Sequence, residues 1–214
     1  MAIVQRSMRM VQAFLKSYGP SSVKKALWDK EFSSTKWDFI DNTAGDCIYP
    51  FLERHSRGGS ILDLGCGPGN TANELAEHAY HRYVGIDISE AALQKARVRS
   101  EENGRGAKNT FVQSDFLSYS SPQKFDVILF RESLYHVPLG KVKTILDKYA
   151  SFLKPDGVFI VRMALSDGEI GEVKRRPSAM LKEIETNFEV LEEEQFGKSR
   201  ATVVVFRPRS STEQ

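Results

Sequence analysis

The sequence is short of cysteine and of long apolar runs. Its two cysteines, Cys47 and Cys66, are too few for a disulfide framework, and no Cys/His spacing predicts a metal site. No stretch approaches the roughly 20 apolar residues that cross a bilayer. Charge of one sign is also lacking, since 30 Lys and Arg stand against 28 Asp and Glu. We therefore expect a cytoplasmic protein, a monomer or homodimer, with no metal, no membrane partner and no nucleic-acid partner.

Acidic residues are absent from the first 28 positions, which is typical of an organellar targeting segment. The apolar residues of the same stretch recur at spacings of four and three, which predicts one face of a helix that packs on something. These residues are Val4, Met8, Val11, Leu15 and Tyr18. We favour a helical cap over residues 1–45, followed by one main domain over 46–208 and a flexible tail over 209–214.

Within the main domain, short β-rich runs alternate with helical patterns, which predicts an α/β fold with a parallel sheet. The predicted strands are 60–65, 83–88, 110–115, 126–130 and 158–163. The predicted helices are 69–79 and 89–104, the latter with Ser89 as N-cap and Gly104 as stop. A third helix is predicted within the stretch 138–157, from Pro138 to Pro155. Two further runs, 188–196 and 201–208, predict a closing antiparallel hairpin.

The first predicted strand runs into the glycine-rich turn "ILDLGCGPGNT" (61–71). Its glycines follow a G-x-G-x-G spacing, unlike the G-x-G-x-x-G of dinucleotide folds or the G-x-x-x-x-G-K-[ST] of a P-loop. Ligands of open α/β sheets bind at the carboxyl ends of the strands, and such a turn lets a ligand approach the backbone closely. Asp63 stands two residues before Gly65, where a carboxylate suits a cationic ligand.

"LDLGCGPG" (62–69), "VGIDIS" (84–89), "QSDF" (113–116) and "FDVILFRESLYHV" (125–137) occur in this order along the chain. With them the chain resembles a class I S-adenosylmethionine-dependent methyltransferase of the small-molecule type. The resemblance covers roughly residues 58–208. It implies a Rossmann-like seven-stranded sheet with helices on both faces, in the order 3-2-1-4-5-7-6, with strand 7 antiparallel.

The resemblance also implies how S-adenosyl-L-methionine is bound. Its methionine part would lie on the loop of Gly65 and Gly67, with Asp63 reaching the ammonium group through water or backbone. The adenosine part would be held by Asp87 on the ribose hydroxyls, Ile88 beside the adenine, Asp115 on the adenine amino group and the Phe116 amide on a ring nitrogen. The carbonyl of Phe130 or Arg131 would face the methionine end.

Each of these residues also has a structural interpretation. Asp87 could cap the helix that follows it, and Asp115 could close the turn at 115–118 by side-chain hydrogen bonding. Cys66 fits a small residue in a tight loop better than a nucleophile. Glu132 and His136 are the candidate catalytic residues after the fourth strand. His136 could instead bond a neighbouring loop, and Glu132 could pair with Arg131 or bind the methionine ammonium group.

The acceptor is expected to be a small molecule, methylated on O, N or S. The N/D-P-P-Y/F tetrapeptide of nucleic-acid amino methyltransferases is replaced by "FRES" (130–133). Tyr135 and Trp37 are candidate substrate contacts, and Trp28, Phe32 and Trp37 could form an aromatic lid or simply pack the cap on the domain. Three other functions stay open: a cofactor-binding partner without catalysis, a nucleic-acid or protein methyltransferase, and a nicotinamide-dependent reductase, although no Tyr-x-x-x-Lys relay is found.

Overall fold

The computed structural model describes residues 2–34, 36–37, 43–165, 169–170, 173–174, 177–197 and 200–209. The predicted cap boundary near residue 45 follows residues 38–42, which lie outside the described residues, as do 210–214 of the predicted tail. Among the described residues, no helix is long and apolar enough to cross a bilayer.

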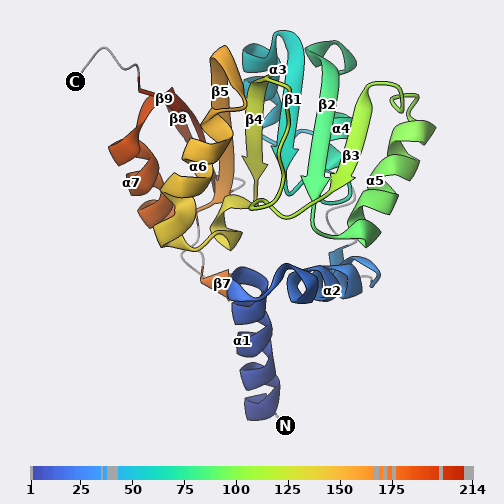
Figure 1. Cartoon of the computed structure of the whole chain (residues 1–214), viewed down its shortest axis with the longest axis vertical. Helices are drawn as coiled ribbons and strands as arrows, with labels where there is room; N and C mark the ends of the chain where they lie inside the picture. The colour runs from blue at the N-terminus through green and yellow to red at the C-terminus, as the bar shows by residue number, and fades with distance from the viewer. Residues whose placement is uncertain are drawn as a thin grey trace.

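Seven of the described strands form one sheet in the order β3-β2-β1-β4-β5-β9-β8 (Figure 1). The strands β1 to β5 are parallel to one another. At the other end of the sheet, β9 is antiparallel to both β5 and β8. The predicted strand order is confirmed. The strands are β1 (Gly58–Leu64), β2 (Tyr80–Asp87), β3 (Asn109–Gln113), β4 (Phe125–Arg131), β5 (Leu153–Ala164), β8 (Phe188–Phe196) and β9 (Ala201–Pro208).

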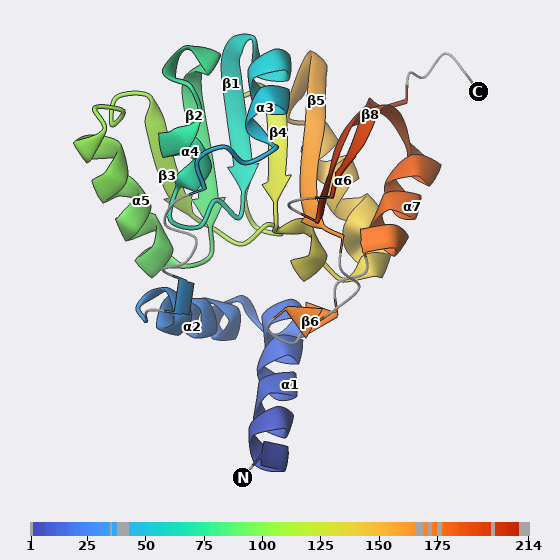
Figure 2. The same ribbon diagram turned by 180° about the vertical axis from the view of Figure 1, so that it is seen from behind.

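Helices cover both faces of the sheet, as the two opposite views show (Figures 1 and 2). One face carries α3 (Tyr49–Ser56), α4 (Asn70–Glu74) and α5 (Glu90–Glu102), and the other carries α6 (Val142–Ala150) and α7 (Pro177–Asn187). Two helices remain outside these layers, α1 (Ala2–Tyr18) and α2 (Ser21–Phe32). They lie below the edge toward which the parallel strands point (Figure 1).

The two hydrophobic clusters follow from the alternation of strand side chains. In β1, Ile61 packs into the cluster with α3 to α5, whereas Leu62 and Leu64 pack into the cluster with α6 and α7. All three side chains are fully buried. Successive strand residues point to opposite faces, so a nearly continuous apolar run is what a sheet covered on both sides requires.

Two helix predictions are wrong at their ends. The helix predicted to run to Pro155 stops at Ala150, because Phe152 and Leu153 instead join the sheet beside Phe125. The helix predicted over 69–79 ends at Glu74 and is followed by a separate 3₁₀ turn. The sequence analysis did not predict α3, α7 or the small hairpin of β6 (Glu169–Ile170) and β7 (Val173–Lys174).

Other local predictions are confirmed. Ser89 caps α5 by accepting a hydrogen bond from the Ala92 amide, and Gly104 adopts a φ of 68° after the helix end. The closing hairpin has the predicted bounds.

The first helix forms as predicted, but its predicted face is only partly buried where side chains are described. Val11 and Tyr18 are 58% and 61% exposed and Leu15 is partly buried, whereas Ala13 and Lys16 are the buried residues within 10–18. The helix projects away from the main domain (Figures 1 and 2). What the apolar face contacts is therefore a separate question.

Candidate functional site

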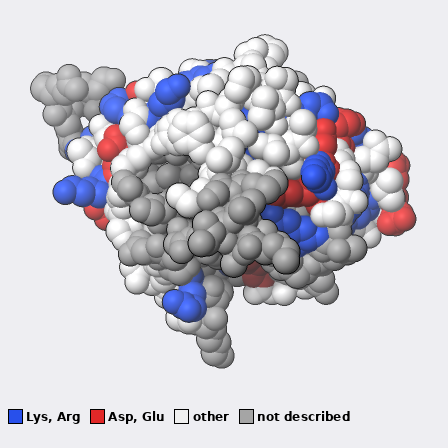
Figure 3. Space-filling view, turned by 90° about the horizontal axis from the view of Figure 1, so that it is seen from below, with Lys and Arg blue, Asp and Glu red and all other residues white. Residues whose placement is uncertain are grey.

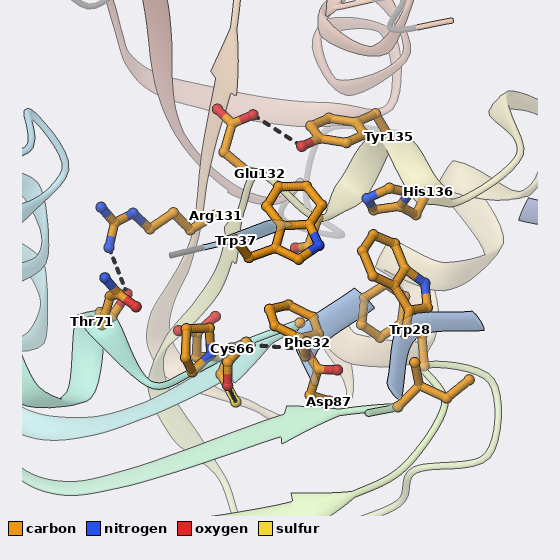
Figure 4. Close-up of a pocket in the computed structure, with 18 of the residues that line it drawn as sticks. Trp28, Phe32, Trp37, Cys66, Thr71, Asp87, Arg131, Glu132, Tyr135 and His136 are labelled. Carbon is orange, nitrogen blue, oxygen red and sulfur yellow. Dashed lines mark hydrogen bonds between the residues drawn. The ribbon is translucent and has the colours of Figure 1, made fainter. Parts of the chain in front are cut away.

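A pocket of about 500 Å³ opens at the carboxyl ends of the parallel strands, between these ends and α2 (Figure 4). This volume is within the range of small-molecule and cofactor sites. All the residues predicted for the site line it: Trp37, Asp63, Gly65, Gly67, Asp87, Ile88, Asp115, Phe116, Arg131, Glu132, Tyr135 and His136. The structure brings them together, while the role of each stays a prediction.

The glycine-rich turn folds back over the end of β2. The Gly65 and Cys66 amides both donate to the Ile86 carbonyl, at 2.8 and 3.0 Å. Gly65 has a φ of 83°, and a Cβ there would lie 2.7 Å from the Ser133 Cβ. A side chain at Gly67 would instead point toward Phe32, 3.8 Å away, into the space below α2. The turn thus leaves its backbone bare toward the pocket.

Asp63 is a buried carboxyl with only one oxygen satisfied. The Tyr83 hydroxyl donates to its Oδ2, and its Oδ1 has no hydrogen-bond partner among the described residues. Burial raises the pKa of Asp63 to about 6, although the Tyr83 bond and the Arg131 charge act to lower it. A buried acceptor without a donor is costly, which favours a ligand group at this position.

Asp87 is held by backbone amides on both oxygens. Its Oδ2 accepts from the Gly67 amide at 2.9 Å and its Oδ1 from the Ser89 amide at 2.8 Å. Burial raises its pKa to about 6, against the effect of these amides. Asp87 therefore stabilises the turn before α5, while the cap itself is Ser89. Each carboxylate oxygen retains a further lone pair for a ligand.

Asp115 connects the end of β3 to α2. Its Oδ1 accepts from the Leu117 amide at 3.0 Å, so the turn interpretation is correct. Its Oδ2 accepts from the Ser21 hydroxyl at 2.8 Å and lies 3.6 Å from the Lys24 ammonium. Burial raises the pKa of Asp115, but the Leu117, Ser21 and Lys24 interactions outweigh it and hold the pKa below its ordinary value.

Two arginines lie side by side at the ends of β4 and β5. Arg131 and Arg162 are register neighbours, so their charges need partners. Arg131 donates to Asp46 at 2.9 Å, and Arg162 pairs with Glu132 and lies 3.4 Å from Asp46. Glu132 also accepts from the Tyr135 hydroxyl at 3.0 Å. The alternative pairing of Glu132 with Arg131 is not observed, because Arg162 occupies one of its oxygens.

Glu132 is also in an unusual backbone conformation. Its φ of 55° lies in the left-handed region, where residues other than glycine are uncommon. Its amide donates to the Arg162 carbonyl at 2.9 Å, which extends the β4–β5 ladder by one residue. Strain of this kind concentrates at functional sites.

Aromatic side chains from the cap form the roof of the pocket (Figure 4). Trp28, Phe32 and Trp37 pack on one another with ring centroids 5.9–6.0 Å apart. The His136 ring packs edge-on against Trp28 at 5.1 Å and beside Tyr135 at 4.7 Å. The aromatic residues thus contact the pocket residues that follow β4 as well as one another.

The cap is attached to the domain by Asp29. Its Oδ1 accepts from the Ser89 hydroxyl at 2.8 Å and from the Ala91 amide at 3.1 Å. Asp29 thereby satisfies an amide in the first turn of α5, where a negative charge is also favoured by the helix dipole. Together with the Ser21 bond to Asp115, it fixes α2 over the loops that follow β2 and β3.

Sequence reasoning missed Asp29, Asp46 and Arg162. A signal existed for Arg162, because a charged residue interrupts the apolar run of β5. Asp46 lies in an irregular segment before α3 and gives no comparable signal. Burial raises the pKa of the Cys66 thiol well above its ordinary value, which fits the prediction that this residue is no nucleophile. The described residues contain no group of three or more metal-ligating side chains.

Comparison with known proteins identifies the family. A model of the family "Methyltransferase domain" matches residues 55–202, and the chain belongs to this family. It is 34% identical over 110 residues to the ubiquinone biosynthesis O-methyltransferase of Idiomarina loihiensis, covering 50% of this chain and 44% of that enzyme. It is 36% identical over 107 residues to the carboxy-S-adenosyl-L-methionine synthase of Wolinella succinogenes, covering 48% and 43%. The chain thus spans less than half the length of these two curated relatives.

A solved structure confirms the fold. The N-methyltransferase NodS of Bradyrhizobium japonicum, in complex with S-adenosyl-L-homocysteine, superposes with a TM-score of 0.67. The superposition covers 87% of this chain and 98% of NodS at 21% identity. At this identity the likeness concerns the fold, which is the predicted Rossmann-like methyltransferase fold.

Proposed function

We propose that the protein transfers a methyl group from S-adenosyl-L-methionine to a small-molecule acceptor, leaving S-adenosylhomocysteine. The observation that carries this proposal is the pocket in which a bare glycine-rich turn meets the buried carboxyls of Asp63 and Asp87. Membership of the methyltransferase domain family supports it.

The residues present fit this cofactor. The unsatisfied Oδ1 of Asp63 suits its ammonium group, and the guanidinium of Arg131, whose charge acts on Asp63, suits its carboxylate. Asp87 offers lone pairs to the ribose hydroxyls, and Asp115 with the Phe116 amide holds the adenine. When bound, S-adenosylmethionine supplies a methyl group that its sulfonium already activates.

The remaining half of the pocket holds the acceptor. Since the methyl group is already activated, the main task is alignment, which can supply on the order of 7–11 kcal/mol. Trp37 and Tyr135 contact the acceptor in this proposal. Glu132, shared between Arg162 and Tyr135, orients the Tyr135 hydroxyl. His136 lines the pocket and is the candidate base for a proton that leaves the acceptor. Such a base contributes roughly 10²–10⁴-fold.

The cap acts as the lid of this site. Its aromatic residues shield the pocket from water, and its polar contacts fall on the loops after β2 and β3, where the adenosine part would lie. The lid interpretation of Trp28, Phe32 and Trp37 is favoured because all three line the pocket. Opening of α2 would then gate entry and release of the cofactor.

The proposal is tested by following the methyl group itself, because one relative is named a synthase rather than a methyltransferase. Calorimetry should show binding of S-adenosylmethionine and none of NADH. Incubation with methyl-labelled cofactor and fractionated metabolite pools should then give a labelled acceptor together with S-adenosylhomocysteine. Binding of NADH without binding of S-adenosylmethionine would overturn the proposed methyl transfer. Binding of S-adenosylmethionine without turnover on any metabolite pool would indicate a partner protein without catalysis.

The acceptor class is tested separately with polynucleotides. An enzyme that neutralises several phosphates binds nucleic acid with a steep salt dependence. We expect only weak binding of RNA or duplex DNA at physiological salt. Tight and salt-sensitive RNA binding would show that the acceptor is not a small molecule.

A further inference from the structure

One face of α1 is apolar and largely exposed over residues 10–18, the part of the helix whose side chains are described. Met10, Val11, Phe14 and Tyr18 are each between 58% and 62% exposed, and the Phe14 and Tyr18 rings stack at 5.0 Å. At about 100° of rotation per residue, these four positions occupy one stripe of roughly 100° on the helix. Lys16 is buried on the opposite side of the helix and Ala13 is buried beside the stripe, between Lys16 and Met10.

The charge of α1 is of one sign. The sequence of the helix contains Arg6, Arg9 and Lys16 and no acidic residue, whereas the chain as a whole has a formal charge of only +2. The rest of the chain is therefore close to neutral. Lys16 is buried and paired with Glu31 of α2 at 2.6 Å, so the positive charge that the helix offers to a partner is that of Arg6 and Arg9. Seen from the side on which α1 projects, basic and acidic side chains elsewhere on the surface are interspersed (Figure 3).

We propose that α1 is an interfacial helix that binds anionic lipid surfaces, with the stripe of Met10, Val11, Phe14 and Tyr18 inserted among the acyl chains. An apolar stripe on a helix with only basic charged residues is the pattern of helices that lie in a membrane surface. The 17 residues of α1 span about 25 Å, too short to cross the hydrocarbon core.

A second copy of this chain could also cover the apolar stripe of α1, but the basic residues of α1 argue against it. Pairing two α1 helices would bring together two segments that are both positive, whereas an anionic bilayer attracts each basic residue near its surface. The prediction of no membrane partner rests on the missing membrane-spanning run, which does not bear on a helix that lies in the interface.

The test is co-sedimentation of the full chain with phosphatidylcholine vesicles, with and without phosphatidylglycerol. We expect binding to the anionic vesicles only, weakened by added salt. Val11→Glu places a charge in the apolar stripe and should lower the vesicle affinity about tenfold or more. The matched control is Val98→Glu on α5, because Val98 is likewise a helical valine that is 50% exposed, and this variant should bind as the parent does.

Three results would overturn the proposal. They are no binding of the parent chain to anionic vesicles, equal losses for Val11→Glu and Val98→Glu, and a dimer in sedimentation velocity that Val11→Glu alone converts to monomer. Unchanged circular dichroism and melting of both variants would show that the fold is intact. The assay needs neither cofactor nor acceptor, so its outcome is independent of the proposed methyl transfer.

Discussion

On the β1–β2 side of the pocket, Asp63 and Asp87 are buried beside hydroxyl and amide donors, whereas Asp46 on the β4–β5 side is partly buried beside two guanidinium groups. The pKa values shift in opposite directions. Burial raises those of Asp63 and Asp87 to about 6. Burial also acts to raise that of Asp46, but Arg131 and Arg162 outweigh it and hold it below its ordinary value.

The difference assigns different tasks to the two sides. A carboxylate that is buried without a cation destabilises the folded chain and is poised to receive a positive ligand. A carboxylate between two arginines lets two like charges lie next to each other in the sheet. We therefore expect substitutions in the ion-pair cluster of Asp46, Arg131 and Arg162 to act first on stability, with loss of Arg131 also weakening cofactor binding. Substitutions of Asp63 and Asp87 should act mainly on cofactor binding.

The largest effect is expected for Arg131→Met. The variant leaves Asp46 with only the more distant Arg162, at 3.4 Å, and breaking a buried pair in this way costs about 3–5 kcal/mol. Urea unfolding measures the loss. Arg97→Met is the control, because Arg97 pairs with Glu90 at the surface and should lose at most about 1 kcal/mol. Equal stabilities of the two variants would contradict the structural role of the Arg131–Asp46 pair.

Asp87→Ala should separate binding from stability. Removing two charge-assisted hydrogen bonds to the ribose, each worth roughly 1.5–3 kcal/mol, lowers the affinity for S-adenosylmethionine about a hundredfold or more. The apo protein should lose less free energy of unfolding than of cofactor binding, because removal of an unfavourable buried carboxylate offsets part of the loss of its bonds to the Gly67 and Ser89 amides. Calorimetry and urea unfolding of the same sample check both parts. If the variant is instead strongly destabilised while its folded fraction binds S-adenosylmethionine with unchanged affinity, Asp87 has a role in stability, as Asp46 does, and not in binding.

The cofactor affinity should depend on pH through the same two carboxyls. With pKa values of about 6, Asp63 and Asp87 become protonated at lower pH. Asp63 then loses the negative charge that attracts the ammonium group, and Asp87 loses the negative charge that strengthens its hydrogen bonds from the ribose hydroxyls. Below pH 6 the affinity for S-adenosylhomocysteine should fall by roughly tenfold per pH unit for each protonated carboxyl. Calorimetry across this range measures it, and Asp63→Asn should flatten the dependence.

Stability of the cofactor-free protein should change with the opposite sign. The folded pKa values lie above the ordinary 3.8, so the folded state binds more protons than the unfolded state between about pH 4 and 6. The free energy of unfolding from these groups is therefore greatest below pH 4 and falls as pH rises through 6. Asp46 has a lowered pKa and loses its contribution only in more acidic solution. For the preceding prediction, a cofactor affinity that is constant between pH 5 and 7 would contradict the raised pKa values of Asp63 and Asp87, because neither carboxyl would then change its charge in this range.

These two sides also differ in what the sequence reveals. The β1–β2 side was predictable because its constraints are local: positive φ at Gly65 and Gly67, and an acid at the end of β2. The alternation of strands and helices predicted a parallel sheet, and the strand order followed from the resemblance. The β4–β5 side depends on contacts between Asp46, Arg131 and Arg162, which come together only through the register of two strands and a segment before the sheet.

The cap shows the same limit. Periodicity predicted helix α1 but not which of its faces the domain covers, because that depends on where α2 and the pocket lie. The helix predicted to end at Pro155 failed for a related reason. Its apolar pattern continues through Phe152 and Leu153, whose burial against the sheet is indistinguishable in sequence from burial on a helix face.

The smallest effect expected is at the contact that joins the cap to the cofactor side of the pocket. Asp29→Ala removes the acceptor for the Ser89 hydroxyl and the Ala91 amide, and loss of such a capping interaction costs about 1 kcal/mol. If α2 opens to release the cofactor, the dissociation rate of S-adenosylhomocysteine should rise about fivefold in stopped-flow measurements, with little change in melting temperature.

Lys25→Ala is the control, because Lys25 pairs with Asp29 but contacts neither Ser89 nor Ala91, and its exposed ion pair contributes little. An unchanged dissociation rate in Asp29→Ala, or an equal rise in both variants, would show that α2 does not gate the pocket through this contact. The cap would then be packing on the domain without controlling access to it.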